Sequence, residues 1–160
     1  MTIALTDRMK SWIEGLGCHL CVASKTGVPM VTVARYCRIV GDGGTVAFAL
    51  TQDEYATIGE QLSQNPWVAF GVSHAGSVRA AYQFKGIGKV ATSGPDYDAI
   101  VAEAPDVIGA KPGAVLYVEL KELYCTKPGH VAGKRLDVMT QDELCGFERD
   151  LKWKDMCPSC

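Results

Sequence analysis

Residues 82–100 read YQFKGIGKVATSGPDYDAI and predict a bent strand followed by a helix. Glycine weakens a strand unless the backbone must bend there or another group must approach it closely. Gly86 and Gly88 are two residues apart, so they lie on one face of the strand and leave that face bare. Pro95 fits the first turn of a helix, where its missing N–H costs no hydrogen bond. The segment therefore predicts tight curvature of the kind that β-barrels require.

The preceding segment, residues 51–72, predicts a helix and then a strand. Thr51 and Glu54 are spaced as in a capping box, in which each side chain accepts a hydrogen bond from the other residue's free backbone N–H. Asn65-Pro66 ends the helix because proline cannot continue it. The apolar periodicity places the helix over 53–63 and the strand over 67–73.

Six segments in all show the alternation and the β-branched residues that are typical of strands. Glycine-rich turns connect several of them as hairpins, and helices are inserted over 7–15, over 53–63 and after Pro95. Six strands joined in this way predict a closed antiparallel β-barrel with inserted helices. The predicted strands are 19–24, 29–40, 45–50, 67–73, 79–91 and 114–124.

The composition is that of one globular domain. Of the 160 residues, 48% are hydrophobic and 21% are charged, which suffices for one buried core. The net charge of −2 and the lack of a Lys/Arg cluster argue against nucleic-acid binding. No apolar run reaches the roughly 18 residues of a membrane span, and the first residues do not resemble a secretory signal. Seven cysteines, an odd number, fit free thiols in a reducing cytoplasm.

In their order, the motifs of residues 7–124 resemble the pyridoxamine-5'-phosphate-oxidase-like family of FMN-binding split barrels, especially its small flavoproteins. The resemblance implies a mainly β fold, a six-stranded antiparallel split barrel with inserted helices. It divides the chain into a flavin-binding barrel, residues 1–126, and a C-terminal extension, residues 127–160. In the extension, a capping box at Thr140 opens a short helix, and a C-x-x-C pair closes the chain.

The resemblance also implies where FMN would lie. In the family, the strand after a Gly-x-Pro-like turn, here Gly27-Val28-Pro29, presents its later residues to the flavin. The following strand supplies backbone groups to the ring. The helix start after it usually holds the phosphate, which free N–H groups and the positive end of the helix dipole favour. The residues implied on the two strands are Val33, Ala34, Arg35, Ala49, Leu50 and Thr51.

The chain departs from the family where that helix usually carries a basic phosphate ligand. Thr57 and Ile58 stand where a Lys or Arg is typical, and both belong to the predicted cofactor site. Thr57 keeps a hydroxyl donor, but the positive charge is missing. We therefore expect Arg35 to supply the charge, or else Arg38, or Arg79 of the same or a partner subunit.

Two C-x-x-C pairs, Cys18/Cys21 and Cys157/Cys160, have the spacing of zinc or iron ligands. Residues three apart in a strand point to opposite faces, so the first pair chelates only if Cys18 lies in the preceding turn. Cys18, Cys21 and Cys37 are better explained as small buried residues. The terminal pair is better explained as an inert tail, and a redox or metal-binding role is its alternative. We predict no metal site, and no nucleophile–base motif identifies a catalytic residue.

The leading hypothesis is a cytoplasmic homodimer that binds FMN and acts as an oxidoreductase on a small molecule, with the cofactor carrying the chemistry. FMN is preferred to FAD because the chain has no glycine-rich fingerprint for a pyrophosphate. A dimer is favoured because Trp67, Val68 and Phe70 supply more large apolar side chains than one short core strand needs. Three alternatives stay open: a non-enzymatic flavin electron carrier, a haem- or metal-binding split barrel, and a cofactor-free interaction module.

Overall fold

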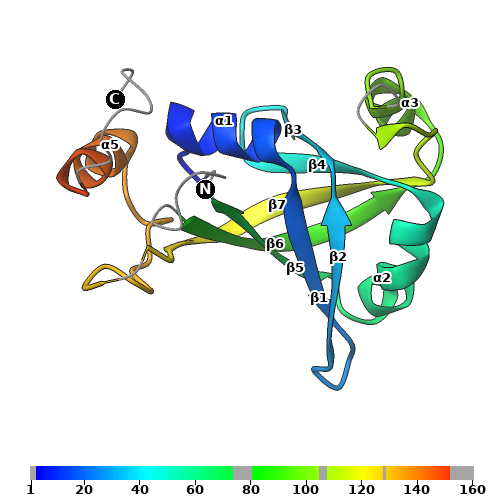
Figure 1. The fold of residues 1–160 in the computed structure, drawn as a ribbon, viewed down its shortest axis with the longest axis horizontal. Helices are drawn as coiled ribbons and strands as arrows, with labels where there is room; N and C mark the ends of the chain where they lie inside the picture. Colours follow the sequence, from blue (N-terminus) through cyan, green and yellow to red (C-terminus); the bar gives the residue numbers. More distant parts are fainter. Residues whose placement is uncertain (1–2, 74–80, 105–107, 128, 152–160) are drawn as a thin grey trace.

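The computed structural model describes residues 3–73, 81–104, 108–127 and 129–151 (Figure 1). One curled sheet runs through the molecule, and the helices lie around it. The strand order is β2-β1-β5-β6-β7-β4-β3, and every neighbouring pair is antiparallel. The strands are β1 (Cys18–Ala23), β2 (Pro29–Ala34), β3 (Tyr36–Val40), β4 (Thr45–Leu50), β5 (Trp67–Ser73), β6 (Ala81–Ala91) and β7 (Ala114–Cys125).

The mainly β, antiparallel architecture is confirmed, but the prediction of six strands is wrong. The predicted strand 29–40 is interrupted at Arg35, which gives the sheet seven strands. Ala34, the last residue of β2, pairs with β1, whereas Tyr36, the first residue of β3, pairs with β4. Two consecutive strands therefore form the opposite edges of the sheet. Because only one residue connects these edges, the sheet must curl until they meet. The result is a barrel whose edge strands β2 and β3 are joined by the backbone at Arg35, and we call the line between these two edges the split.

The helices begin at the signals that the sequence carries. Both predicted capping boxes form, Thr51 with Glu54 and Thr140 with Glu143. Each box satisfies backbone N–H groups that a helix start would otherwise leave without partners. The helices are α1 (Asp7–Leu16), α2 (Gln52–Gln64), α3 (Pro95–Val101) and α5 (Gln141–Asp150).

The main core lies inside the curl of the sheet. Phe70 occupies its centre, with its ring centroid 5.0 Å from that of Phe48 in an edge-on contact and 5.0 Å from that of Phe84 in a stacked contact. Such aromatic pairs add to the hydrophobic gain of burial. Helix α1 packs against β3 and β5 and contributes Trp12, whose ring lies 5.9 Å from that of Tyr82. A smaller core between α3 and the outer face of β4 and β7 includes Ala49 and Tyr97.

The C-terminal extension packs on the same main core as the barrel. Its helix α5 contributes Leu144 and Phe147 to that core, and it also buries the carboxylate of Glu148. Glu148 Oε1 accepts hydrogen bonds from the Thr6 hydroxyl at 2.9 Å and the Tyr82 hydroxyl at 2.5 Å, and Oε2 lies 3.6 Å from Arg8 Nη1. A buried carboxylate is tolerated only with such partners. The network therefore ties α5 to α1 and β6.

The glycines of β6 permit the bend of the central strand pair. A Cβ on Gly86 would lie 2.2 Å from the carbonyl oxygen of Glu119 on β7, where the β6–β7 register shifts between Lys85 and Gly86. A Cβ on Gly88 would lie 2.9 Å from Val68 Cγ2. The bare face is thus used for the close approach of a neighbouring backbone and side chain, as the sequence predicts.

We expect Gly86→Ala to destabilise the fold by about 3 kcal/mol, the upper part of the usual range for overpacking, because a backbone carbonyl cannot move aside as a side chain tip can. Gly71→Ala is the matched control, since a Cβ on that β5 glycine would meet only the Tyr82 carbonyl oxygen at an ordinary 3.7 Å. Urea unfolding followed by circular dichroism measures both. Equal midpoints for the two variants would contradict the assigned role of Gly86.

Candidate functional site

The predicted flavin-contacting residues of β2 border a cavity at the sheet edge. Val33, Ala34 and Arg35 line it together with Gly17, Cys18 and His19 at the start of β1, and its volume is about 230 Å³. Gly17 has a φ of +63°, and a Cβ there would lie 2.8 Å from the Ala34 carbonyl oxygen, so glycine keeps the two strands close. Sequence analysis alone missed His19 and Gly17 because they neighbour β2 only through strand pairing.

Arg35 faces the start of helix α2. Its Nε lies 3.6 Å from Oε1 of Glu54, and the other oxygen of that carboxylate accepts the backbone N–H of Thr51 at 2.8 Å. Two predicted site residues, Arg35 and Thr51, therefore meet around one carboxylate. The capping box identifies Glu54 from sequence, but its contact with Arg35 depends on how α2 packs against β2.

Glu54 bears directly on anion binding at this place. Its side chain is only 11% exposed and carries a negative charge between the guanidinium group of Arg35 and the first turn of α2. An incoming phosphate would repel this carboxylate, so it must either displace Glu54 or approach Arg35 from its exposed side, since 60% of the Arg35 side chain is exposed.

The two residues that replace the family's basic ligand are placed differently from each other. Thr57 is exposed, and its hydroxyl donates to the carbonyl oxygen of Asp53 at 2.8 Å, which uses its single proton. Ile58 is fully buried in the main core. Thr57 can accept a hydrogen bond in this arrangement but cannot donate one to a phosphate.

The remaining predicted residues are buried and offer no exposed surface to a ligand in this structure. Ala34, Ala49 and Leu50 have no exposed surface. Ala49 lies between Tyr36 on β3 and Val115 on β7, and the Leu50 carbonyl oxygen accepts the N–H of Gly113 at 2.8 Å. The cofactor roles of these three residues stay predictions.

Arg38, the second candidate for the missing charge, is engaged by another carboxylate. It donates a hydrogen bond to Glu103, which also accepts from the Tyr36 hydroxyl at 2.8 Å. These two hydrogen bonds, first that of Arg38 and then that of Tyr36, lower the pKa of the Glu103 carboxyl below its usual range. Arg79, the third candidate, lies outside the described residues.

A larger cavity of about 380 Å³ lies between the end of β6 and the start of α3, lined by residues 89–96 and Tyr117. The Tyr117 hydroxyl donates to the backbone carbonyl oxygen of Asp96 at 2.6 Å, and burial raises the pKa of this phenol. Lys89 is the cation in its wall. In sequence, only the Ser93-Gly94-Pro95 turn marks this place, and it indicates a helix start rather than a cavity.

The cysteines do not form a metal site in the part of the chain that the structure describes. There, no group of three or more His, Cys, Asp or Glu side chains is placed to hold a metal ion. Cys18 is buried inside the barrel, whereas Cys21 is half-buried and three residues further along β1, on the opposite face. Cys157 and Cys160 lie outside the described residues. Among the described helices, none is long and apolar enough to cross a membrane.

Comparison of the sequence with known protein families and with curated proteins finds no match. The structure, in contrast, is similar to several solved proteins. HupZ from Group A Streptococcus is 21% identical at a TM-score of 0.68, with 81% of this chain and 100% of that chain covered. A candidate pyridoxamine 5'-phosphate oxidase from Lactobacillus delbrueckii is 16% identical at a TM-score of 0.61, covering 75% and 93%.

The chain shares the split-barrel fold of these two proteins.

An FMN-binding protein from Syntrophomonas wolfei has the same split-barrel fold, at 12% identity and a TM-score of 0.58, with 76% of this chain and 85% of that chain covered. A protein named F420 reductase is also similar, at 16% identity and a TM-score of 0.57, covering 74% and 98%. Identities this low establish a shared fold. One of these proteins is named for FMN and another for F420, so the fold alone does not determine the ligand, and its choice rests on the side chains of each chain.

The contact between Arg35 and Glu54 predicts opposite effects of two substitutions on FMN affinity. Arg35→Ala should weaken binding roughly tenfold to a hundredfold, the value of one charge-assisted hydrogen bond. Glu54→Gln should tighten binding about fivefold, since it removes a like charge near the phosphate. Thr57→Ala is the control with little effect, because its hydroxyl proton is committed to Asp53. Fluorescence quenching of FMN measures all three, and unchanged affinity in both charge variants would rule out this phosphate position.

Proposed function

We propose that this protein binds FMN beside Arg35 and works as a flavin-dependent oxidoreductase on a small molecule. The observation that carries the proposal is that Arg35 and Thr51 both contact the Glu54 carboxylate at the start of α2, next to the cavity that Val33 helps to line. These are positions at which the split-barrel resemblance implies the flavin phosphate and ring. An exposed guanidinium group supplies the positive charge that the Thr57-Ile58 stretch lacks.

The chain's own residues would bind and orient the cofactor. Arg35 would form an ion pair with the phosphate, and Val33, which is 41% exposed, would offer apolar contact to the ring system. Bound flavin supplies the capacity to accept and release electrons. No described side chain is required to attack a substrate. Residues around the cavity mouth would bind the substrate and determine its identity.

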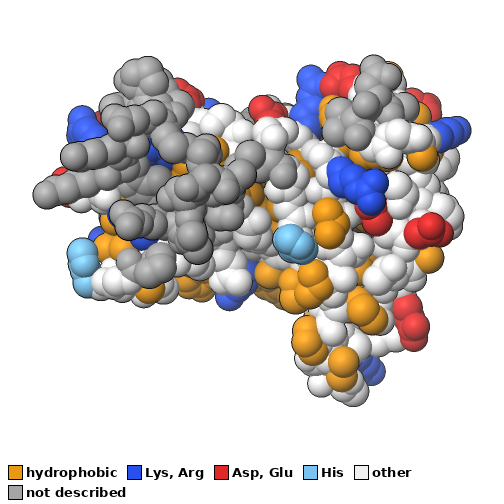
Figure 2. All heavy atoms as spheres, in the orientation of Figure 1, with side chains coloured by type: hydrophobic (Ala, Val, Ile, Leu, Met, Phe, Trp, Pro, Cys, Tyr) orange, Lys and Arg blue, Asp and Glu red, His pale blue; other side chains and the backbone are white. Residues whose placement is uncertain are grey.

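We further propose that the site is completed by a second copy of the chain. The cavity of about 230 Å³ is smaller than typical ligand pockets, which span roughly 300–1,000 Å³. Figure 2 shows hydrophobic side chains gathered over the β1–β2 hairpin beside it. Exposed apolar patches of this kind mark interaction surfaces.

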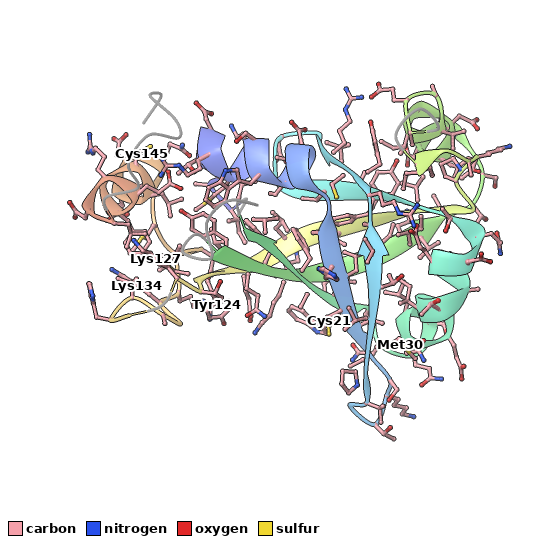
Figure 3. The ribbon with its side chains drawn as sticks, in the orientation of Figure 1. Cys21, Met30, Tyr124, Lys127, Lys134 and Cys145 are labelled. Atoms are coloured by element: carbon pink, nitrogen blue, oxygen red, sulfur yellow. The ribbon has the colours of Figure 1, made fainter. Side chains whose placement is uncertain are left out.

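The residues of this patch form rows across three strands. Val31 on β2 lies opposite Cys21 on β1, which lies opposite Ala69 on β5. Val31 is 54% exposed, and Trp67, two residues before Ala69, is 45% exposed. Met30 belongs to the other face of the hairpin, since it pairs with the buried Val22 (Figure 3). We call Val31, Val33, Cys21, Ala69 and Trp67 the outer patch.

The flavin proposal is tested by the spectrum of the purified protein and by the ligand released on denaturation. We expect an absorption band near about 450 nm and release of FMN. Release of FAD would overturn the choice of cofactor. A Soret band, or no FMN binding by the apo-protein, would overturn the flavin function and favour the haem-binding or cofactor-free alternative.

The dimer proposal is tested separately by light scattering at micromolar concentration. The parent chain should have twice its monomer mass of 17.2 kDa, and Val31→Lys should fall to the monomer mass because a charge cannot be desolvated in an apolar interface. Val138→Lys is the matched control, since Val138 is 73% exposed but lies outside the outer patch. A parent chain of 17.2 kDa would refute the dimer.

A further inference from the structure

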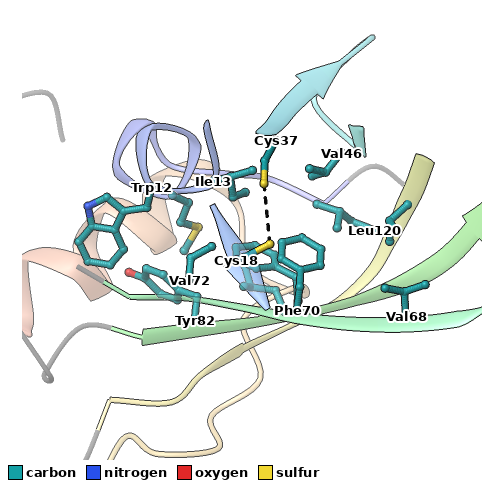
Figure 4. Close-up of a cluster of buried hydrophobic side chains, with 14 of the residues drawn as sticks. Trp12, Ile13, Cys18, Cys37, Val46, Val68, Phe70, Val72, Tyr82 and Leu120 are labelled. Atoms are coloured by element: carbon teal, nitrogen blue, oxygen red, sulfur yellow. Dashed lines mark hydrogen bonds between the residues drawn. The ribbon is translucent and has the colours of Figure 1, made fainter. Parts of the chain in front are cut away.

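Two thiols from different strands meet beneath the predicted flavin site. The sulfur atoms of Cys18 on β1 and Cys37 on β3 lie 3.8 Å apart, as the dashed line in Figure 4 shows. Cys18 is 6% exposed and Cys37 is 4% exposed. Nineteen positions separate them in sequence, so neither the C-x-x-C spacing nor any local motif brings them together.

The curl of the sheet creates this contact. Cys18 pairs with Ala34 at the end of β2, and the chain then turns at Arg35 into β3, which carries Cys37 back over the start of β1. The Cys37 thiol also lies 3.9 Å from the Ala34 carbonyl oxygen. The two thiols therefore span the split at which the edges of the sheet meet.

We propose that Cys18 and Cys37 are a redox-active dithiol that closes to a disulfide and locks the split of the barrel. A disulfide has an S–S length of about 2.05 Å, so each sulfur needs to move by about 1 Å. The bond would join β1 directly to β3. Its two cysteines lie close to the Arg35 corner, since Cys18 pairs with Ala34 and Cys37 follows Arg35 by two residues. It would close a covalent loop that contains the whole β1–β2 hairpin, which restricts the unfolded chain.

A hydroperoxide is the class of oxidant that fits the site, because it is small enough to reach a thiol that is only 6% exposed, and Cys18 is the member of the pair whose residue borders the cavity. The Cys18 sulfur attacks one peroxide oxygen, the O–O bond breaks, and Cys18 becomes a sulfenic acid while the other oxygen leaves as water or an alcohol. The Cys37 sulfur then attacks the Cys18 sulfur, the S–O bond breaks, and a second water leaves with the Cys37 proton. The two thiols lose two electrons, and the peroxide gains them.

The environment of the pair makes this a slow, protected modification. The hydrogen bond with Cys37, and then burial, raise the pKa of the Cys18 thiol, so little reactive thiolate is present at neutral pH. Cys37 already touches Cys18, so a sulfenic acid formed there is resolved before it can be oxidised further. The inference depends on the fold alone and stands whether or not the protein binds flavin.

Hydrogen peroxide treatment of the full chain, followed by alkylation in denaturant and peptide mass mapping, tests the proposal. Trypsin releases Cys37 in residues 36–38 and Cys18, together with Cys21, in residues 11–25. We expect these two peptides to be linked after oxidation, with two alkylated cysteines fewer, and dithiothreitol to restore both.

Two single substitutions identify the cysteines that form the disulfide. Cys21→Ala should keep the link, because Cys21 lies on the other face of β1, whereas Cys37→Ala should abolish it. A link that disappears in Cys21→Ala, a disulfide from Cys18 to another cysteine, or full alkylation of both residues in the oxidised parent chain would each overturn the proposal. Fragmentation of the linked peptides shows whether Cys18 or Cys21 carries the alkyl group, so the parent chain alone decides the question even if a variant does not fold.

Discussion

Gly86 on β6 lies so close to the Glu119 carbonyl on β7 that no side chain fits between them, and this contact controls the shape of the sheet. β6 and β7 are the longest strands and lie next to each other in the sheet. Their register shift at this contact bends both, and the bend lets the sheet curl. With a flatter central pair, the outer strands β2 and β3 could not reach each other through the single residue Arg35.

The corner at Arg35 positions the main charged residue of the candidate site. Ala34 and Tyr36, the residues on either side of it, are held by opposite edges of the sheet, so the backbone at Arg35 is fixed from both directions. Its side chain is left exposed beside α2, and the Cys18–Cys37 pair lies beneath it in the core. A cofactor bound here would lie where the two edges of the sheet meet.

Three arginines of the structure each lie close to a carboxylate. Arg35 faces Glu54, Arg38 faces Glu103, and in the core Arg8 lies near Glu148. The buried pair is structural, since removing either partner would leave a charge in the protein interior. In the proposed site, a phosphate would compete with the Glu54 carboxylate for Arg35 or would bind on the exposed side of that arginine.

The local elements could be predicted from sequence: both capping boxes, the helix end before Pro66, and the strands 45–50 and 67–73 depend on contacts within a few residues. The sequence also indicated through Gly86 and Gly88 that a neighbour comes close. Three features could not be predicted from sequence and depend on the folded chain: the break of strand 29–40 at Arg35, the contact of Glu54 with that arginine, and the contact of Cys18 with Cys37. Periodicity and capping report positions along one chain segment, whereas these contacts join segments whose neighbours are set by strand register and by the curl of the whole sheet.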